Sequence, residues 1–222
     1  GLRGDTERDT YRTGKSTLAV VVAPPSALKL QPIPPSADWQ FHLAEGCPGH
    51  CQYCYLAGSL SGPPVVRAFA NLPAILGNLA RYERPGLDTT FEVSCYTDPL
   101  AVEHLTGSLS ACVRHFAGRP NATLRWVSKY ADVSPLIGLE HNGRTRCRAS
   151  VNVPEVERFE GGTASVDRRL AALRRLALPR GAGGGGYPVG LVVAPIMPVD
   201  NWQKEYAGLL DRAAAALDFP CD

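Results

Sequence analysis

The chain has 222 residues, 45% of them hydrophobic, which is enough for one globular domain with a sizeable core. Its net charge of +2 gives no global field that would indicate a nucleic-acid partner, and no run of about 18 apolar residues could span a membrane. No apolar signal segment opens the chain, and its thiols would have to stay reduced, so we expect a cytoplasmic protein. Because the chain begins at Gly1 and stops abruptly at Asp222, we also expect it to be a piece of a longer protein.

Residues 1–38 are expected to form an N-terminal arm, one strand and a Pro-rich connector. The segment 1–17 is polar and lacks an apolar period, which predicts a loose arm. The apolar run at 18–22 predicts a strand, and the prolines between residues 24 and 35 mark the connector.

The sequence Gly-Lys-Ser-Thr at 14–17 is similar to the end of a phosphate-binding P-loop. The full motif needs a glycine five places before Gly14, where Asp9 stands, and a helix after it, where the strand 18–22 follows. We therefore reject a nucleoside triphosphate site here.

Residues 39–222 are expected to form an α/β domain. Strands are expected at 39–43, 89–94, 123–127, 145–151 and 187–194, and helices at 72–79, 102–116, 133–139, 166–176 and 206–217. This alternation predicts a parallel sheet with right-handed crossovers, in which the chemistry lies at the carboxyl ends of the strands. The helix at 166–176 carries four arginines that we expect to face solvent: Arg168, Arg169, Arg174 and Arg175.

A loop with three cysteines follows the strand at 39–43. Cys47, Cys51 and Cys54 have the spacing C-x3-C-x2-C, among glycine and proline residues and interleaved with Tyr53 and Tyr55. Three thiolates aimed at one point suit an iron–sulfur cluster, and they leave the fourth iron of a cube open for chemistry. The spacing differs from the runs found in ferredoxins. The pattern alone therefore predicts a metal site with three thiolate ligands.

The cysteines have two alternative interpretations. A structural zinc site would need a fourth ligand, and no second ligand pair follows, although His50 or a distant cysteine could serve. A disulfide framework is disfavoured, because the chain has an odd number of cysteines (seven) and is too large to need stapling.

The cysteine loop and several later segments resemble the spore photoproduct lyases, a family of radical-SAM enzymes that repair DNA. The resemblance starts near Thr13 and covers nearly the whole chain. It implies a partial (βα)6 radical-SAM barrel, here truncated after the fifth βα unit, without the C-terminal strand and the DNA-contacting region. The matching segments are 46–56, 91–98, 103–106, 141–146, 163–167, 169–172 and 192–196.

The resemblance also implies two cofactors. A [4Fe-4S] cluster would be held by Cys47, Cys51 and Cys54, and S-adenosylmethionine (SAM) would chelate its open iron. Three polar residues at or just past strand ends match positions that contact SAM in the family: Thr97, Lys129 and Ser150. The alternative for the lysine is a solvated surface side chain.

Cys95 ends the second barrel strand, where the family has a cysteine that donates a hydrogen atom to the repaired thymine. A thiol suits this role because its sulfur is polarizable and its S–H bond is weak; the alternative is a small buried hydrophobic residue. Tyr53 and Tyr55 match tyrosines that relay the radical back to the cofactor. Ordinary aromatic packing is the alternative for both.

The implied activity is a radical-SAM DNA repair lyase that reverses the methylene-bridged thymine dimer (spore photoproduct) to two thymines, using a 5′-deoxyadenosyl radical. The implied partners are UV-damaged DNA, with the lesion flipped out of the stack, and an external electron donor such as flavodoxin or ferredoxin. No membrane partner is expected. Two alternatives stay open: a radical-SAM enzyme with another substrate, and a non-enzymatic iron–sulfur or zinc-binding module.

Overall fold

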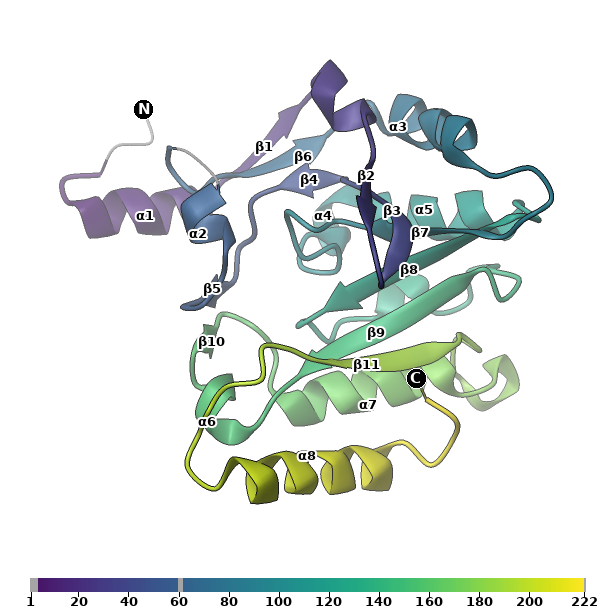
Figure 1. Cartoon of the computed structure of the whole chain (residues 1–222). Coiled ribbons are helices and arrows are strands. Elements are labelled where there is room, and N and C mark those ends of the chain that lie inside the picture. The colour runs from purple at the N-terminus through teal and green to yellow at the C-terminus, as the bar shows by residue number, and fades with distance from the viewer. Residues whose placement is uncertain (1–3, 60–61, 222) are drawn as a thin grey trace.

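A six-stranded sheet forms the centre of the computed structural model, which describes residues 4–59 and 62–221 (Figure 1). The strand order is β11-β9-β8-β7-β3-β2, in which β2 pairs antiparallel with β3 and all other neighbours are parallel. The five parallel strands are those expected from the sequence. The six strands are β2 (Gln31–Ile33), β3 (Ala37–Phe41), β7 (Thr89–Val93), β8 (Ala122–Ser128), β9 (Thr145–Val151) and β11 (Val189–Val193).

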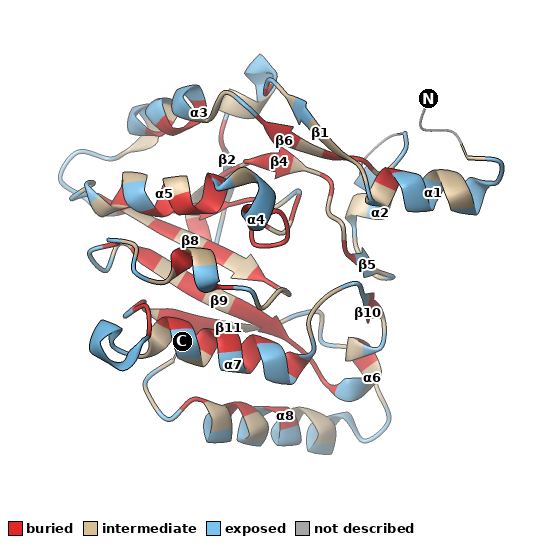
Figure 2. Ribbon diagram, turned by 180° about the vertical axis from the view of Figure 1, so that it is seen from behind, coloured by how far each residue is buried: buried red, intermediate tan, exposed pale blue. Residues whose placement is uncertain are grey.

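Helices α5 (Ser108–Ala117) and α7 (Val166–Ala177) lie on the same face of this sheet, as Figure 2 shows, and α8 (Trp202–Ala216) packs outside α7. Their apolar stripes meet the strands in a core that includes Phe91, Trp126 and Leu170. Burying such a side chain stabilises the folded state by about 1.5–3 kcal/mol. The packing of the apolar helix faces on the strands therefore stabilises this fold. Further helices are α3 (Leu72–Leu79) and α6 (Pro154–Glu157), with 3-10 turns η1 (Pro25–Leu28), η2 (Ala80–Tyr82) and η4 (Arg180–Ala182).

The prediction of a single helix at 102–116 is wrong, because the chain turns at Gly107. This glycine has φ +62° and separates α4 (Glu103–Thr106) from α5. The buried carboxylate of Glu103 accepts hydrogen bonds from two backbone N–H groups in the first turn of α5, those of Leu109 (2.7 Å) and Ser110 (3.0 Å). A left-handed glycine and an acidic cap thus start a new helix. At 133–139 the expected helix is reduced to the 3-10 turn η3 (Ser134–Leu136).

The N-terminal segment is not a loose arm. Helix α1 (Glu7–Lys15) begins after Thr6, whose hydroxyl accepts a hydrogen bond from the backbone N–H of Asp9. Strand β1 (Leu18–Val21) then pairs in parallel with β6 (Val66–Phe69), a strand that the sequence did not predict. Strand β4 (Ala44–Glu45) completes this second sheet in the order β1-β6-β4.

No helix within the described ranges has both the length and the apolar character needed to cross a bilayer.

Candidate active site

The three-cysteine loop does not follow β3 directly, because β4 comes between them. The loop begins at Gly46, whose backbone N–H donates a 2.9 Å hydrogen bond to the carbonyl of Tyr96, past the end of β7. Gly46 has φ +83°, and a Cβ there would lie 2.5 Å from the carbonyl oxygen of Val65. Only glycine allows this close approach. The loop is therefore pinned near the carboxyl end of the parallel sheet.

Backbone contacts shape the rest of the loop. Strand β5 (His50–Cys51) pairs antiparallel with β10 (Glu160–Gly161), which places Cys51 opposite Glu160. The backbone N–H of Gly49 points at the sulfur of Cys47, at 3.4 Å, and the backbone N–H of Cys54 donates to the carbonyl of Cys51 at 3.1 Å. All three cysteines are free and partly exposed. Helix α2 (Leu56–Ser59) follows directly.

This donor set fits an iron–sulfur cluster. Three thiols lie within one short loop, and an N–H group directed at a cysteine sulfur is a contact that tunes such clusters. Burial, followed by the charge of Asp98, raises the pKa of the Cys47 thiol to about 11, and a bound metal would deprotonate it. Among residues 4–59 and 62–221, no group of three His, Cys, Asp or Glu side chains is arranged to hold a single ion. In a [4Fe-4S] cluster each cysteine would bind a different iron atom. The lack of a single-ion site is therefore compatible with a cluster at Cys47, Cys51 and Cys54.

Cys95 lies at the same edge of the sheet. It follows β7 after Ser94, a residue in the left-handed region (φ +66°), and the hydroxyl of Tyr55 donates a hydrogen bond to its backbone carbonyl. Burial, followed by the charge of Glu92, raises the pKa of the Cys95 thiol to about 12. The sulfur therefore keeps its hydrogen at neutral pH, as a hydrogen-atom donor must. The structure brings the predicted donor and one predicted relay tyrosine together.

Tyr53 points to the other side of the loop. Its hydroxyl donates to the carboxylate of Glu160, and the ammonium of Lys129 lies 5.6 Å from the centre of its ring. Burial, followed by this hydrogen bond and charge, raises the pKa of Tyr53 above its ordinary value. The tyrosine therefore stays protonated.

Two of the three predicted SAM contacts are joined directly. Lys129 follows β8, and its Nζ lies 2.8 Å from the hydroxyl of Ser150 on β9 and 2.7 Å from the carboxylate of Glu160. Burial would raise the pKa of Glu160, but hydrogen bonds from Lys129 and Tyr53 and the nearby positive charges lower it. Lys129 is thus a paired, mostly buried lysine rather than a solvated one.

Thr97, the third predicted contact, is not hydrogen-bonded to this pair. It is buried, and within the described ranges its hydroxyl has no hydrogen-bond partner. The next residue, Asp98, accepts hydrogen bonds from the backbone N–H of Lys129 (2.8 Å) and the hydroxyl of Ser128 (2.7 Å). An unpaired buried hydroxyl costs about 1–3 kcal/mol, so this position suits a polar ligand.

The sequence did not predict Glu160 as a site residue, and it predicted that Arg169 faces solvent. Arg169 is only 1% exposed, and its guanidinium lies 2.6 Å from the carboxylate of Glu160. It also donates to the carbonyl of Ser150 (2.9 Å) and the hydroxyl of Thr163 (2.8 Å). The expectation that all four arginines of α7 face solvent is therefore wrong for this one. The available signal was its place beside the apolar stripe, next to Leu170.

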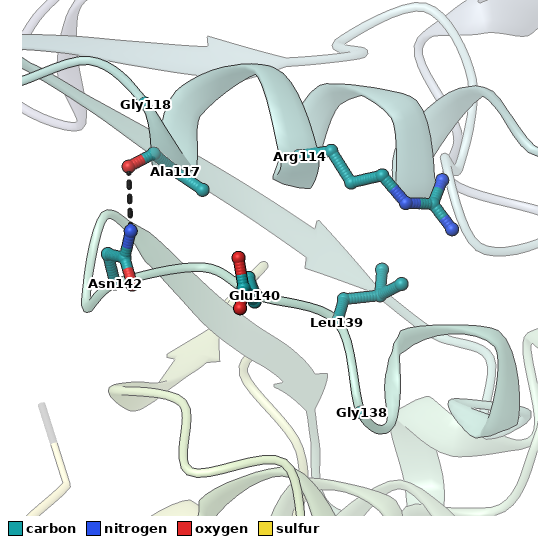
Figure 3. A pocket seen from close by; sticks show the side chains of 7 residues that line it. All are labelled: Arg114, Ala117, Gly118, Gly138, Leu139, Glu140 and Asn142. Carbon is teal, nitrogen blue, oxygen red and sulfur yellow. Dashed lines mark hydrogen bonds between the residues drawn. The ribbon is translucent and has the colours of Figure 1, made fainter.

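A surface hollow of about 490 Å³ lies elsewhere, between the end of α5 and the loop before β9 (Figure 3). Asn142 closes one side of it with a 3.1 Å hydrogen bond to the carbonyl of Ala117. Because β8 and β9 begin beside this hollow, it lies at the amino ends of the strands. It does not contain the cysteine loop or Cys95.

A parallel α/β sheet whose carboxyl edge carries a C-x3-C-x2-C loop and a further thiol defines a protein of the radical-SAM type. The family model described as "Spore photoproduct lyase" matches residues 1–220, and the chain belongs to that family.

Relatives and solved structures agree with this assignment. The chain is 41% identical over 221 residues to a spore photoproduct lyase of Geobacillus sp. (strain Y412MC61), covering 98% of this chain and 62% of the relative. It is 37% identical over 219 residues to that of Bacillus subtilis (strain 168), covering 97% of this chain and 62% of the relative. The chain thus spans about three fifths of the length of these relatives.

Two solved structures are similar over 98% of this chain and 62% of their own length, at 40% identity. One is a spore photoproduct lyase complexed with dinucleoside spore photoproduct, with a TM-score of 0.89. The other is a spore photoproduct lyase mutant with bound AdoMet and dinucleoside spore photoproduct, with a TM-score of 0.90.

Proposed function

We propose that the chain is the catalytic part of a radical-SAM lyase that reverses the methylene-bridged thymine dimer in DNA to two thymines. Membership of the family and the substrate bound in its solved structures support this activity. The hydrogen bond from Tyr55 to the carbonyl of Cys95 carries the proposal, because it joins the cysteine loop to the hydrogen donor.

Cys47, Cys51 and Cys54 would hold a [4Fe-4S] cluster, and Thr97, Lys129 and Ser150 would bind SAM. The ammonium of Lys129 would pair with the carboxylate of SAM, and the unpartnered hydroxyl of Thr97 would gain a hydrogen bond. When bound, the cluster and SAM would together supply a 5′-deoxyadenosyl radical, which removes a hydrogen atom from C6 of the bridged thymine.

Cys95 would complete the repair. After the bridge breaks, its thiol gives one hydrogen atom to the thymine radical and becomes a thiyl radical. Tyr55, whose hydroxyl contacts the backbone of Cys95, and Tyr53 would relay a hydrogen atom from 5′-deoxyadenosine to the thiyl radical. This transfer would restore the Cys95 thiol and both tyrosines and would return the radical to the cofactor. The high pKa of each of these groups keeps the transferable hydrogen in place.

The five parallel strands would belong to a partial (βα)6 barrel that is truncated after the fifth βα unit. In this reading residues 1–38 form the N-terminal segment and residues 39–222 the barrel, and the last strand and the DNA-contacting region lie outside the chain. Residues of the N-terminal segment contribute to both the six-stranded and the three-stranded sheet, because β1 pairs with β6 and β2 pairs with β3. We further propose a cytoplasmic location and reduction by flavodoxin or ferredoxin.

An anaerobic assay on a dinucleotide spore photoproduct tests the function. The chain is reconstituted with iron and sulfide, reduced with dithionite and supplied with SAM, and release of thymine is measured. Cleavage of SAM without thymine release would indicate another radical-SAM substrate. Absence of SAM cleavage would indicate a non-enzymatic iron–sulfur or zinc module.

A further inference from the structure

We propose that Lys15, at the end of helix α1, is a positioning residue that fixes the cysteine loop and adds a positive charge beside the cluster. The inference rests on the proposed cluster at Cys47, Cys51 and Cys54. It gives a role to the 14–17 segment, which is similar to a P-loop but lacks the features of a phosphate site.

The ammonium of Lys15 lies 2.7 Å from the carbonyl oxygen of Cys47 and 2.5 Å from that of Gly49. Both contacts are partly buried. An ammonium has three donors, and hydrogen bonds from a charged donor are about twice as strong as neutral ones. One side chain thus holds both ends of the turn from Cys47 to Gly49.

A second side chain of α1 reaches the same loop. Tyr11 lies one helical turn before Lys15, and its hydroxyl is 3.2 Å from Nδ1 of His50. The ring centres of Tyr11 and His50 are 5.7 Å apart, and the Lys15 ammonium lies 5.7 Å from the ring of Tyr11. Residues at i and i+4 share a helix face, so α1 presents this face to the loop.

Helix α1 is itself held in place. Gly14 is buried, and a Cβ there would lie 2.9 Å from Cδ of Pro64, so the helix backbone packs closely on the chain before β6. Just after the helix, the carbonyl of Thr17 accepts a 3.1 Å hydrogen bond from the backbone N–H of Val66. Lys15 therefore extends from a fixed support.

The other polar side chains of the segment do not form a phosphate cradle. The hydroxyl of Ser16 donates to the carbonyl of Arg12 at 3.0 Å, and that of Thr17 donates to the carbonyl of Thr13 at 2.6 Å. Both hydroxyls are used within the turn. Of residues 15–17, Lys15 is the one whose side chain contacts the cysteine loop.

Two consequences follow for a bound cluster. Outer contacts that orient ligands change metal affinity by about 10–100-fold when they are removed. A fixed positive charge also favours the state of the cluster that carries the added electron, which raises its reduction potential. Lys15 therefore affects both iron retention and reduction.

The test compares Lys15→Gln with Lys29→Gln, which makes the same change at an exposed lysine outside the site. After anaerobic reconstitution, iron retention against a chelator and the midpoint potential are measured. We expect Lys15→Gln to lose iron about 10–100-fold more readily and to have a lower potential, and Lys29→Gln to match the parent chain. Lys15→Arg should retain iron, because a guanidinium can donate to both carbonyls. Parental iron retention and potential in Lys15→Gln would overturn the inference.

Hydrogen exchange of the iron-free chain separates this inference from the proposed function. Lys15→Gln should speed exchange at 47–52 and leave β8 and β9 unchanged, whether or not the parent chain assembles a cluster. Tyr11→Phe, which removes one hydroxyl, should have a smaller effect at the same residues. Unchanged exchange in both variants, or global unfolding of Lys15→Gln, would contradict a role confined to the loop. A parent chain that assembles no cluster would instead overturn the proposed function.

Discussion

The guanidinium of Arg169 lies 2.6 Å from the carboxylate of Glu160, and neither side chain is exposed. This ion pair lies beneath the proposed SAM site, because Glu160 also contacts Lys129 and Tyr53. One buried carboxylate thus orients a candidate cofactor contact and a candidate relay tyrosine.

Replacing Arg169 by Leu should therefore destabilise the fold. The change leaves one oxygen of Glu160 buried without its cation, which costs about 3 kcal/mol or more. Urea unfolding followed by circular dichroism measures the loss. Arg168→Leu, at the exposed neighbouring position, should stay within about 0.5 kcal/mol of the parent chain. Equal stability of the two variants would contradict a structural role for the ion pair.

Cys95→Ala should separate SAM cleavage from repair. The variant keeps the cysteine loop and should still cleave SAM, but it lacks the hydrogen donor, so thymine release should fall by about tenfold or more. Chromatography of both products from one reaction measures this ratio. Cys221→Ala, a change at another partly exposed cysteine, is the control. An unchanged ratio in Cys95→Ala would remove the donor assignment.

Gly46→Ala should displace the cysteine loop. The new Cβ would meet the carbonyl of Val65, and alanine at φ +83° costs about 1–3 kcal/mol. Bound iron after reconstitution should drop while the secondary structure is kept. Gly58→Ala is the matched control, because nothing lies within 4 Å of a Cβ there. The same iron content in both variants would show that the loop tolerates the side chain.

Because His42 is partly buried, the fold should be less stable in mild acid than at neutral pH. Burial lowers the pKa of His42 to about 4, below the ordinary value of 6.5. Between these values the unfolded chain binds a proton that the folded chain does not, so the free energy of unfolding decreases by about 1.4 kcal/mol for each unit by which the pH is lowered. Urea unfolding at pH 7 and pH 5 measures the slope. His42→Gln should flatten it, and an unchanged slope would assign the effect to other groups.

The five parallel strands of the main sheet could be predicted because their apolar residues form a local pattern, as in 145–151, which matches β9. Strand β2 was missed, because it lies in the Pro-rich segment that was expected to be a connector. The break at Gly107 was missed, since one glycine within an apolar stripe does not reveal the Glu103 carboxylate that caps the next helix. The contacts of Arg169 and Lys15 could not be predicted either, because their partners come from distant parts of the chain. Local sequence therefore indicated which residues carry chemistry, and the tertiary contacts showed what supports them.

The pairing of β5 with β10 joins Cys51, a proposed cluster ligand, to Glu160, which holds the proposed SAM contact Lys129. Iron bound at Cys51 would order β5, and β10 would then present Glu160, and through it Lys129, already in position. Occupancy of either centre should favour the other by the same factor, because coupling between binding sites is reciprocal. Through the two-residue ribbon, a loaded metal site would strengthen SAM binding, and bound SAM would strengthen metal retention by the same factor.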